Sequence, residues 1–578
     1  TDLAQGEHVE LSFNGIRYDY VADYFGGSGN DLVLVWANGR LLGWGYNYEG
    51  LLGDGSGIAR NVPVEVVTSG ILDGKTVTRM TRGDGHNLAL CADGTVASWG
   101  DGFYGQLGTG VGGDSLVPVP VLQSGVLAGR MVVDVSAGNN YSLVLCSDGT
   151  LAAWGWNYDG QLGDGRGSLG RASDEPVLVD QSGVLAGKSV VAISAGALHC
   201  LVLCEDGSMA AWGANHSGAL GNNSTEDSPV PVLVEQTGAL AGRSVVEISA
   251  GDGFNLVLCS DGTLVGWGGN SSGQLGDNSS DSRMVPVVVD QSGVLAGRTV
   301  VGIDARGGNY YYDYHSVAVC SDGSVATWGG GGEGQLGNGT TNGSLVPLLA
   351  RKIGALGGKT ALVGRGGTGF TLVLCSDGTL ASLGTNYYGE LGNGTNNDSL
   401  VPVPVGGLGD GERFHTIAAG SGGGLAWTAR PPVATATTLA AIGIEDTAGM
   451  LKGNVSAQGS TTSVWVEYGV TPAYGSTVSA APSAVTGSAS TAVSAPLSGL
   501  QADTTYHYRL VATSNGGRVT GEDRTFTTTD LAGLSDMTLS AGTLSPEFSG
   551  LQTDYLATVP FATSSVRMTP VTALPGAT

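Results

Sequence analysis

Basic residues are scarce in this sequence. Its 578 residues include 25 Lys and Arg against 51 Asp and Glu, so the formal net charge is −26 at pH 7. Because a surface that binds nucleic acid must be basic, this balance excludes nucleic acid as an expected partner. Long apolar runs are missing as well. None approaches the roughly 18 residues that span a membrane, so we expect no membrane span in this chain.

Motifs of catalytic and metal sites are also missing. The sequence contains no phosphate loop, zinc-ligand spacing, nucleophile elbow or paired-carboxylate motif, so it predicts no enzyme, no cofactor and no metal site. Histidines are few, 7 in all. Three of them share a repeat position that holds Tyr or Phe in other copies, which indicates a packing role; these are His86, His199 and His315.

Cysteines are few and do not form a disulfide framework. Six of the 7 share one position of an internal repeat and so lie about one structural unit apart, whereas a bridge needs Cα atoms within about 7 Å. The seventh, Cys200, precedes Cys204 by four residues, which is about 13 Å along a strand. We therefore expect buried, unpaired thiols, with Trp36 in the same slot of the first copy.

Glycine, by contrast, is abundant, with 100 residues, and it marks the internal repeat. The stretch CSDGTLAAWGWNYDGQLGDG at 146–165 returns in seven copies. Each period contains four short runs of β-branched or alternating apolar residues, and an Asp-Gly pair typical of a tight hairpin. Four strands in a repeated unit predict the blade of a β-propeller. The central residues, 55 to 61 apart, are Trp44, Trp99, Trp154, Trp212, Trp267, Trp328 and Leu383.

The repeats resemble those of the regulator of chromosome condensation family, which carry an AGxxHSLxLxxDGxxxxWGxNxxGQLG pattern. The resemblance covers Leu41 to about Thr428 and implies a seven-bladed propeller. In such a ring the Trp fills the space between blades, and the glycines of the GQLG segment allow a close approach to the next blade. Two further runs, 414–420 and 424–428, match the first two strands of a repeat, so we expect them to complete the blade that begins at Leu41. Residues 31–36 compete for the same place.

The flanking segments resemble other β modules. Residues 1–36 resemble the end of an autotransporter-associated β-strand repeat. The segment after the ring resembles a fibronectin type III domain, with Trp465 as its core tryptophan and Tyr506 at a tyrosine corner. The last segment resembles part of a cadherin-like sandwich. The predicted fold class is all-β, a seven-bladed β-propeller followed by β-sandwich domains. The predicted domain boundaries are 1–36, 37–429, 430–529 and 530–578.

Two recurring sets of residues are candidates for a binding surface. Aromatic residues follow the central Trp-Gly in blades one, two, three and seven and fill an insertion in blade six; they suit protein or glycan binding, and packing between loops is the alternative. Six basic residues precede the repeat cysteines and form either an anion-binding face or, as we favour, ion pairs with the repeat aspartates. The aromatic set is Tyr46, Tyr48, Phe103, Tyr104, Trp156, Tyr158, Tyr387, Tyr388, Tyr310, Tyr311, Tyr312 and Tyr314. The basic set is Lys75, Arg130, Lys188, Arg243, Arg298 and Lys359.

These features predict a non-enzymatic, extracellular or cell-surface structural or adhesive protein of bacterial origin, with the propeller as a binding platform and the sandwiches as spacers. The expected partners are a protein or glycan at the cell surface, or a second copy of the chain through head-to-tail strand addition. One alternative is a guanine-nucleotide exchange factor-like regulator of a small GTPase, which the family resemblance implies for some members. A second alternative is a carbohydrate-binding or carbohydrate-active module.

Overall fold

The chain divides into two compact units, Thr1–Ser12 with Arg17–Arg430 and Phe13–Ile16 with Pro431–Thr578. Among the described residues, no helix is long and apolar enough to cross a membrane. The computed structural model describes residues 3–13, 16–26, 31–37, 39–166, 172–307, 314–409, 411–430, 432–514, 516–529, 534–545 and 555–572.

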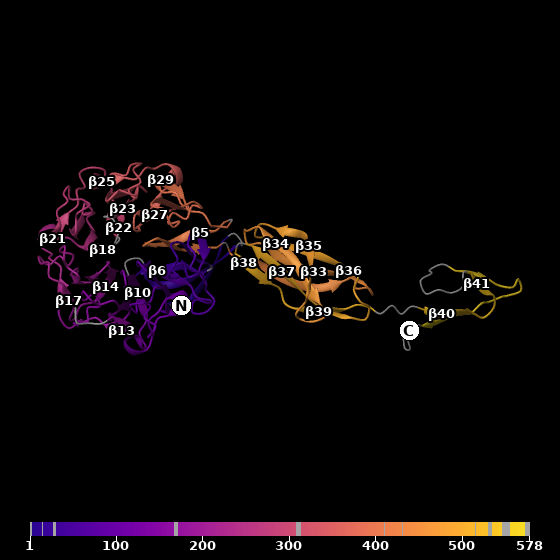
Figure 1. Ribbon diagram of the computed structural model, residues 1–578. Coiled ribbons are helices and arrows are strands. Elements are labelled where there is room, and N and C mark those ends of the chain that lie inside the picture. The colour runs from indigo at the N-terminus through magenta and orange to yellow at the C-terminus, as the bar shows by residue number, and fades with distance from the viewer. Residues whose placement is uncertain are drawn as a thin grey trace. The chain divides into compact units, whose positions relative to one another are not determined.

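The first unit is a β-propeller. Within the described ranges it contains seven four-stranded antiparallel sheets, arranged as blades around a central axis (Figure 1). Six blades are built from four consecutive strands each, and blade 1 combines strands from both ends of the unit. The all-β propeller prediction is therefore confirmed. Blade 2 consists of β6(Val77–Arg82), β7(His86–Cys91), β8(Val96–Gly100) and β9(Ser115–Pro120), and blade 3 of β10(Val132–Ala137), β11(Tyr141–Cys146), β12(Leu151–Gly155) and β13(Ser173–Leu178). Blade 4 consists of β14(Val190–Ala195), β15(His199–Cys204), β16(Met209–Gly213) and β17(Ser228–Leu233), and blade 5 of β18(Val245–Ala250), β19(Phe254–Cys259), β20(Leu264–Gly268) and β21(Arg283–Val288). Blade 6 consists of β22(Val300–Arg306), β23(His315–Cys320), β24(Val325–Gly329) and β25(Ser344–Leu349), and blade 7 of β26(Ala361–Gly366), β27(Phe370–Cys375), β28(Leu380–Gly384) and β29(Ser399–Pro404). Short 3-10 turns precede blades 3, 5 and 7, at η1(Gly125–Leu127), η3(Gly238–Leu240) and η4(Gly354–Leu356).

The repeat motif builds the central hairpin of each blade. In blade 3 the amide of Gly149 donates to the carbonyl of Cys146, and the amide of Cys146 donates to the carbonyl of Thr150, both at 2.9 Å. The Asp148 carboxylate accepts the Thr150 amide at 3.0 Å. Both strands of this hairpin are buried along their whole length, because each blade packs against a neighbour on either side.

The central tryptophans join each blade to the preceding one. Trp154 donates its indole N–H to the carbonyl of Gln106 in blade 2 at 2.8 Å, and all six tryptophans at this position are fully buried. The second glycine of the GQLG segment lies against the tryptophan of the next blade. A Cβ on Gly163 would lie 2.7 Å from Nε1 of Trp212, and its φ is +66°. The expected roles of the Trp and of this glycine are confirmed.

Blade 1 closes the ring as predicted. Leu41 faces Trp427 in an antiparallel register that joins the start of the repeat region to its end. The ring therefore leaves no free sheet edge at this junction. The strands of blade 1, in sheet order, are β30(Arg413–Gly420), β31(Gly423–Ala429), β4(Leu41–Gly45) and β5(Arg60–Glu65).

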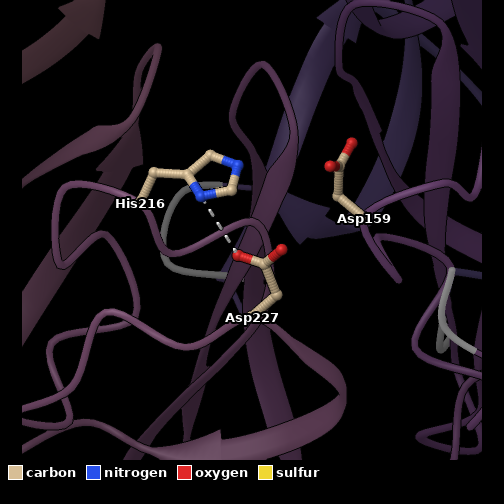
Figure 2. Close-up of side chains that lie close together, drawn as sticks. All are labelled: Asp159, His216 and Asp227. Carbon is tan, nitrogen blue, oxygen red and sulfur yellow. Dashed lines mark ion pairs between the residues drawn. The ribbon is translucent and has the colours of Figure 1, made fainter.

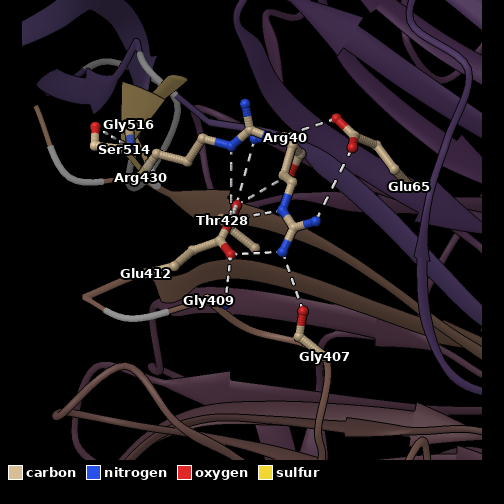
Figure 3. A network of polar contacts seen from close by, with 9 residues as sticks. All are labelled: Arg40, Glu65, Gly407, Gly409, Glu412, Thr428, Arg430, Ser514 and Gly516. Atoms are coloured by element: carbon tan, nitrogen blue, oxygen red, sulfur yellow. Dashed lines mark hydrogen bonds and ion pairs between the residues drawn. The ribbon is translucent and has the colours of Figure 1, made fainter. Parts of the chain in front are cut away.

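A polar network fixes this junction (Figure 3). Glu412 accepts two hydrogen bonds from Arg40, from Nε at 2.7 Å and from Nη2 at 2.6 Å, and a third from the Thr428 hydroxyl at 2.7 Å. Arg430 lies 3.3 Å from Glu65 and 3.8 Å from Glu412. Charged groups from both ends of the unit are thus joined at one point.

The charges at this junction are reversed relative to the other blades. Thr428 holds the register position of the repeat cysteine, because it faces Phe414 as Cys146 faces Val132. Glu412 lies sixteen residues before Thr428, the spacing at which blades 2 to 5 and 7 carry a Lys or Arg before their cysteine. In blade 1 the acid therefore stands where the other blades carry the base.

Trp36 does not fill the cysteine slot of the first blade, so that prediction was wrong. It ends β3(Asp31–Trp36), which pairs with β2(Ile16–Gly26) and β1(His8–Phe13) in a separate three-stranded sheet. The Trp36 ring packs edge-on against Tyr20, with centroids 5.2 Å apart. The expected competition with the closing strands does not arise, because β3 takes its partner from its own sheet.

The repeat cysteines and histidines are part of the core. All 7 cysteines are free and buried, as predicted. His199 is buried in contact with Asn255, 2.9 Å from Nε2 to Oδ1. Burial lowers the pKa of His86 to about 3 and that of His199 to about 4. Both rings are therefore neutral, structural groups at neutral pH.

The second unit is also built from strands. Its core includes Leu451, Val466 and Tyr508. Tyr506 accepts the amide of Gln501 at 3.0 Å, the type of contact expected at that position. Trp465 is only half-buried and lies outside this core, so its predicted central role was wrong. The strands at 432–529 are β32(Thr435–Ile442), β33(Ala448–Ser456), β34(Thr462–Gly469), β35(Ser476–Val485), β36(Ser490–Ser498), β37(Thr505–Ser514), β38(Gly517–Thr520) and β39(Arg524–Thr527).

The last segment consists of two separate strand pairs. None of the residues whose burial is described, within 537–545 and 555–571, is buried. Leu556 and Phe561 are largely exposed. The pairs are β40(Leu534–Leu539) with β43(Met568–Thr572), and β41(Thr543–Ser545) with β42(Leu556–Thr558).

Candidate partner-binding surface

Eight of the predicted aromatic residues lie on one set of loops, between the third and fourth strands of blades 7, 1, 2 and 3, which are consecutive around the ring. Four of the rings face solvent and four are half-buried. The exposed ones are Tyr48 (69%), Phe103 (75%), Tyr158 (61%) and Tyr387 (74%). The half-buried ones are Tyr46, Tyr104, Trp156 and Tyr388. We call these eight residues the aromatic arc.

The half-buried rings meet across blade boundaries. Tyr388 of blade 7 packs edge-on against Tyr46 of blade 1, with centroids 5.0 Å apart. Tyr104 of blade 2 makes the same contact with Trp156 of blade 3 at 4.4 Å. Each half-buried pair therefore packs the loops of adjacent blades together, and the exposed rings lie beside these pairs. A binding role for the exposed rings stays a prediction.

Acidic residues surround part of the arc. A cavity of about 740 Å³ lies beside Tyr46, Tyr387 and Tyr388. No lining residue that the structure describes is basic. Burial raises the pKa of Asp101 and of Glu390, because a carboxylate loses hydration there. An aromatic and acidic hollow attracts cations through both its charge and its ring faces. The acidic residues that line this cavity are Glu49, Asp84, Asp101, Glu333 and Glu390.

The insertion of blade 6 does not extend the arc in the described residues. Tyr314 is half-buried and packs against the hydrophobic core that includes Phe254 and Trp328. It lines a smaller cavity of about 220 Å³ with His216 and Asp252. Tyr310, Tyr311 and Tyr312 lie outside the described residues.

The six basic residues of the predicted ring each form an ion pair within their own blade. The Arg130 guanidinium lies 2.9 Å from Asp148, and the Lys359 ammonium lies 3.2 Å from Asp377. Because every positive charge faces a carboxylate of the adjacent hairpin, the geometry favours the ion-pair interpretation over an anion-binding face. The other pairs are Lys75–Asp93, Lys188–Asp206, Arg243–Asp261 and Arg298–Asp322.

One group of metal-ligating side chains was missed at the sequence level. Asp159 of blade 3 lies near His216 and Asp227 of blade 4, with one ligand atom from each within 4.8 Å of the others (Figure 2). Asp227 accepts the amide of Asn215 at 2.7 Å, so its carboxylate also stabilises the loop of blade 4. Histidine and carboxylates suit a divalent cation, but two of the three are exposed and the geometry alone assigns no metal. A repeat alignment reveals His216, because it takes the position of Tyr48 and the other exposed rings of the arc.

Comparison with known proteins agrees with the blade geometry. The model described as "Regulator of chromosome condensation (RCC1) repeat" matches residues 38–90, 93–145, 148–203, 206–258 and 377–427. A second model of the same description matches residues 132–161, 190–219 and 245–274.

Curated relatives share the repeats. The chain is 32% identical to the E3 ubiquitin-protein ligase HERC2 of Homo sapiens over 411 residues, which is 71% of this chain but 8% of HERC2. It is 32% identical to the ultraviolet-B receptor UVR8 of Arabidopsis thaliana over 332 residues, which is 57% of this chain and 70% of UVR8.

Solved structures show the same fold. Human WBSCR16 aligns with a TM-score of 0.58 at 23% identity, covering 67% of this chain and 98% of that one. Prp20p of Saccharomyces cerevisiae aligns with a TM-score of 0.57 at 20% identity, covering 68% of this chain and 91% of that one. The structure of Prp20p was described together with its binding properties to Gsp1p and histones.

These relatives contradict the prediction of an extracellular structural or adhesive protein. They are a ubiquitin ligase, a light receptor and a protein that binds Gsp1p and histones, all from eukaryotes. The error came from weighting the short flanking resemblances above the seven repeats, which carry the stronger match. The expected bacterial origin and the autotransporter, fibronectin and cadherin resemblances receive no support from these matches.

Proposed function

This chain belongs to the regulator of chromosome condensation (RCC1) repeat family, and we propose that its propeller is a non-enzymatic platform that binds another protein through the aromatic arc. The observation that carries the proposal is the pairing of half-buried rings across blade boundaries, which holds the four exposed rings in place. Exposed aromatic rings on rigid supports give large contact area at a low entropic cost. The relative Prp20p, which binds proteins, supports the same class of function.

The charge of the surface indicates a basic partner segment. Glu49 of blade 1 and Asp101 of blade 2 line the same cavity as Tyr46. A Lys or Arg side chain can place its charge near these carboxylates and its stem against a ring. The overall charge of −26 adds long-range attraction for such a segment.

Fluorescence anisotropy with a labelled Lys/Arg-rich peptide and the full chain tests this proposal. We expect the triple substitution Tyr48→Ala, Phe103→Ala and Tyr387→Ala to weaken binding at least tenfold while the fold is retained. The control is Phe561→Ala, which removes a fully exposed ring outside the arc. Equal affinity of the triple variant and the control would reject the arc as the docking surface.

A second candidate function is regulation of a small GTPase by nucleotide exchange. The likeness to Prp20p, whose described partners include Gsp1p, favours it. The test is the release rate of fluorescent GDP from purified Gsp1p with and without the chain. An increase of at least tenfold supports exchange activity, and an unchanged rate with retained peptide binding leaves the binding platform as the function.

Several earlier expectations stay predictions. The comparisons do not bear on glycan binding, on head-to-tail association or on a cell-surface location. The domain boundaries and the fibronectin type III and cadherin-like character of residues 430–578 also remain proposals.

A further inference from the structure

Two arginines break the repeat pattern at the centre of the ring. The first strand of each blade ends beside the central channel. The position of this strand that faces the second residue of the next strand holds Ala or Gly in six blades, whereas blade 2 has Arg82. The next residue is Gly in six blades, whereas blade 6 has Arg306. The small residues at the first position are Ala137, Ala195, Ala250, Ala305, Gly366 and Ala419.

The two exceptions come together in space. Nη2 of Arg306 donates to the backbone carbonyl of Arg82 at 3.3 Å, although 224 residues separate them. Both side chains line a cavity of about 330 Å³ in the central channel, formed by the first strands of the blades. The neighbouring blades leave room for them: a Cβ on Gly366 would lie 2.7 Å from Cβ of Arg306, and one on Gly420 would lie 2.6 Å from Cγ of Arg82.

The Arg82 guanidinium is buried and forms no ion pair among the described residues. Arg82 is 1% exposed, and the only described hydrogen bond of its guanidinium runs from Nη2 to the carbonyl of Ser421 at 3.3 Å. Its Nε and Nη1, and the Nε of Arg306, meet no acceptor among the described residues. Other arginines of the channel are paired, as Arg79 is with Asp23 at 3.1 Å. Arg82 is therefore unusual among them.

Carboxyl groups nearby offset this charge only in part. Glu390 acts to raise the pKa of Arg82, but burial outweighs it, and Asp134 and Asp304 line the same cavity. Asp84 lies 3.8 Å from Nη2 of Arg306 and forms no described ion pair with Arg82. Burial and the charge of Asp84 raise the pKa of Asp252 to about 6. Burial lowers the pKa of Arg82 to about 9, so its guanidinium stays charged at neutral pH. A buried charge without a partner costs several kcal/mol, and such groups are normally paired.

We propose that the central channel binds a small oxyanion, a phosphate or a carboxylate, between the guanidinium groups of Arg82 and Arg306. Guanidinium forks bind both kinds of oxyanion through paired N–H donors. The unpaired donors of Arg82 and Arg306 supply this recognition, and the cavity is large enough for a group of that size. The proposal does not depend on the partner of the aromatic arc.

Thermal unfolding of the full chain in HEPES, with sodium chloride replaced by sodium phosphate or sodium acetate at constant ionic strength, tests the site. Bound anion stabilises the folded state by mass action, so we expect a saturable rise of the midpoint. A rise with phosphate alone indicates a phosphate site, and a rise with acetate as well indicates that an acidic side chain or terminus also fits. No saturable rise with either anion overturns the proposal.

The variant Arg82→Ala places in blade 2 the residue that five other blades carry at this position. We expect its apparent anion affinity to fall at least tenfold, and its midpoint in chloride to equal or exceed that of the natural chain. Arg306→Gly provides a second variant, since Gly stands at that position in the other six blades. Arg130→Ala, outside the channel, is the control and keeps the full response. A full anion response in both channel variants overturns the assignment.

Discussion

Arg40 and Glu412, 372 residues apart in the chain, form a two-armed ion pair at the closing blade. Only 3% of the Glu412 side chain is exposed. Burial alone acts to raise the pKa of Glu412, but the hydrogen bonds from Arg40 and Thr428 hold it below its ordinary value. The pair is thus charged at neutral pH and joins the two ends of the propeller.

Arg40→Ala removes the main partner of this carboxylate, and we expect it to lower the free energy of unfolding by about 3 kcal/mol, because a buried charge is left behind. The matched control is Arg130→Ala, which breaks an exposed ion pair of blade 3 and should cost less than about 1 kcal/mol. Urea unfolding of both variants measures the difference. Equal losses of unfolding free energy would show that the Arg40–Glu412 pair stabilises the closed ring no more than an exposed ion pair does.

Gly163→Ala tests the close approach between blades. The added Cβ meets Nε1 of Trp212 at 2.7 Å and the backbone has φ of +66°, so we expect strain of about 1 kcal/mol plus an overpacking cost of about 1–3 kcal/mol. Gly149→Ala is the control, because its φ is +83° but nothing lies within 4 Å of its Cβ. The unfolding midpoint should fall more for Gly163→Ala. A larger loss at Gly149 would contradict the packing argument.

The aromatic arc separates into two classes by stability. Tyr104→Ala removes the edge-on contact with Trp156 and should cost about 1–2 kcal/mol. Phe103→Ala and Tyr48→Ala remove exposed rings and should change the free energy of unfolding by less than about 0.5 kcal/mol. Thermal unfolding of the three single variants checks the order. A loss at Tyr48 as large as that at Tyr104 would assign the exposed rings to packing.

Asp252→Asn should change how stability depends on pH. The folded-state pKa of Asp252 is about 6, above the ordinary value of 3.8, because of burial first and the charge of Asp84 second. The folded chain therefore holds this proton to higher pH than the unfolded chain, and the group's contribution to stability falls as pH rises from about 4 to about 7. We expect the variant to gain stability relative to the natural chain across that window, measured by urea midpoints at pH 4.5 and pH 7.5. A difference that does not vary with pH would contradict the raised pKa.

The repeat predicted the blades well because each blade makes the same contacts with its neighbours. The Asp-Gly turn before Thr150, the buried Trp154 and the close approach at Gly163 all follow from local sequence. The assignment of Trp36 failed because the partner of β4 comes from the far end of the repeats, where Thr428 carries no sequence signal of a cysteine slot. A residue replaced in only one copy is invisible to a consensus.

The site was harder to predict than the fold. The aromatic loops were visible in the sequence, but their division into exposed and half-buried rings depends on which blade each ring meets. Tyr388 packs on Tyr46 only because blade 7 is the neighbour of blade 1 in the closed ring. Arg82 and Arg306 were not predicted as a site, because each replaces a small residue in one repeat only and their proximity appears only in three dimensions.

The pairing of Leu41 with Trp427 has a consequence for synthesis of the chain. A ribosome adds about 5–20 residues per second, so the strand that begins at Leu41 waits roughly 20 to 80 s for its partner to emerge. During that time β4 has only β5 beside it and presents an open edge. An equivalent β31 from a neighbouring nascent chain has the same sequence as the native partner, so strand exchange at this edge is the misassembly to which the closing blade is most open during synthesis.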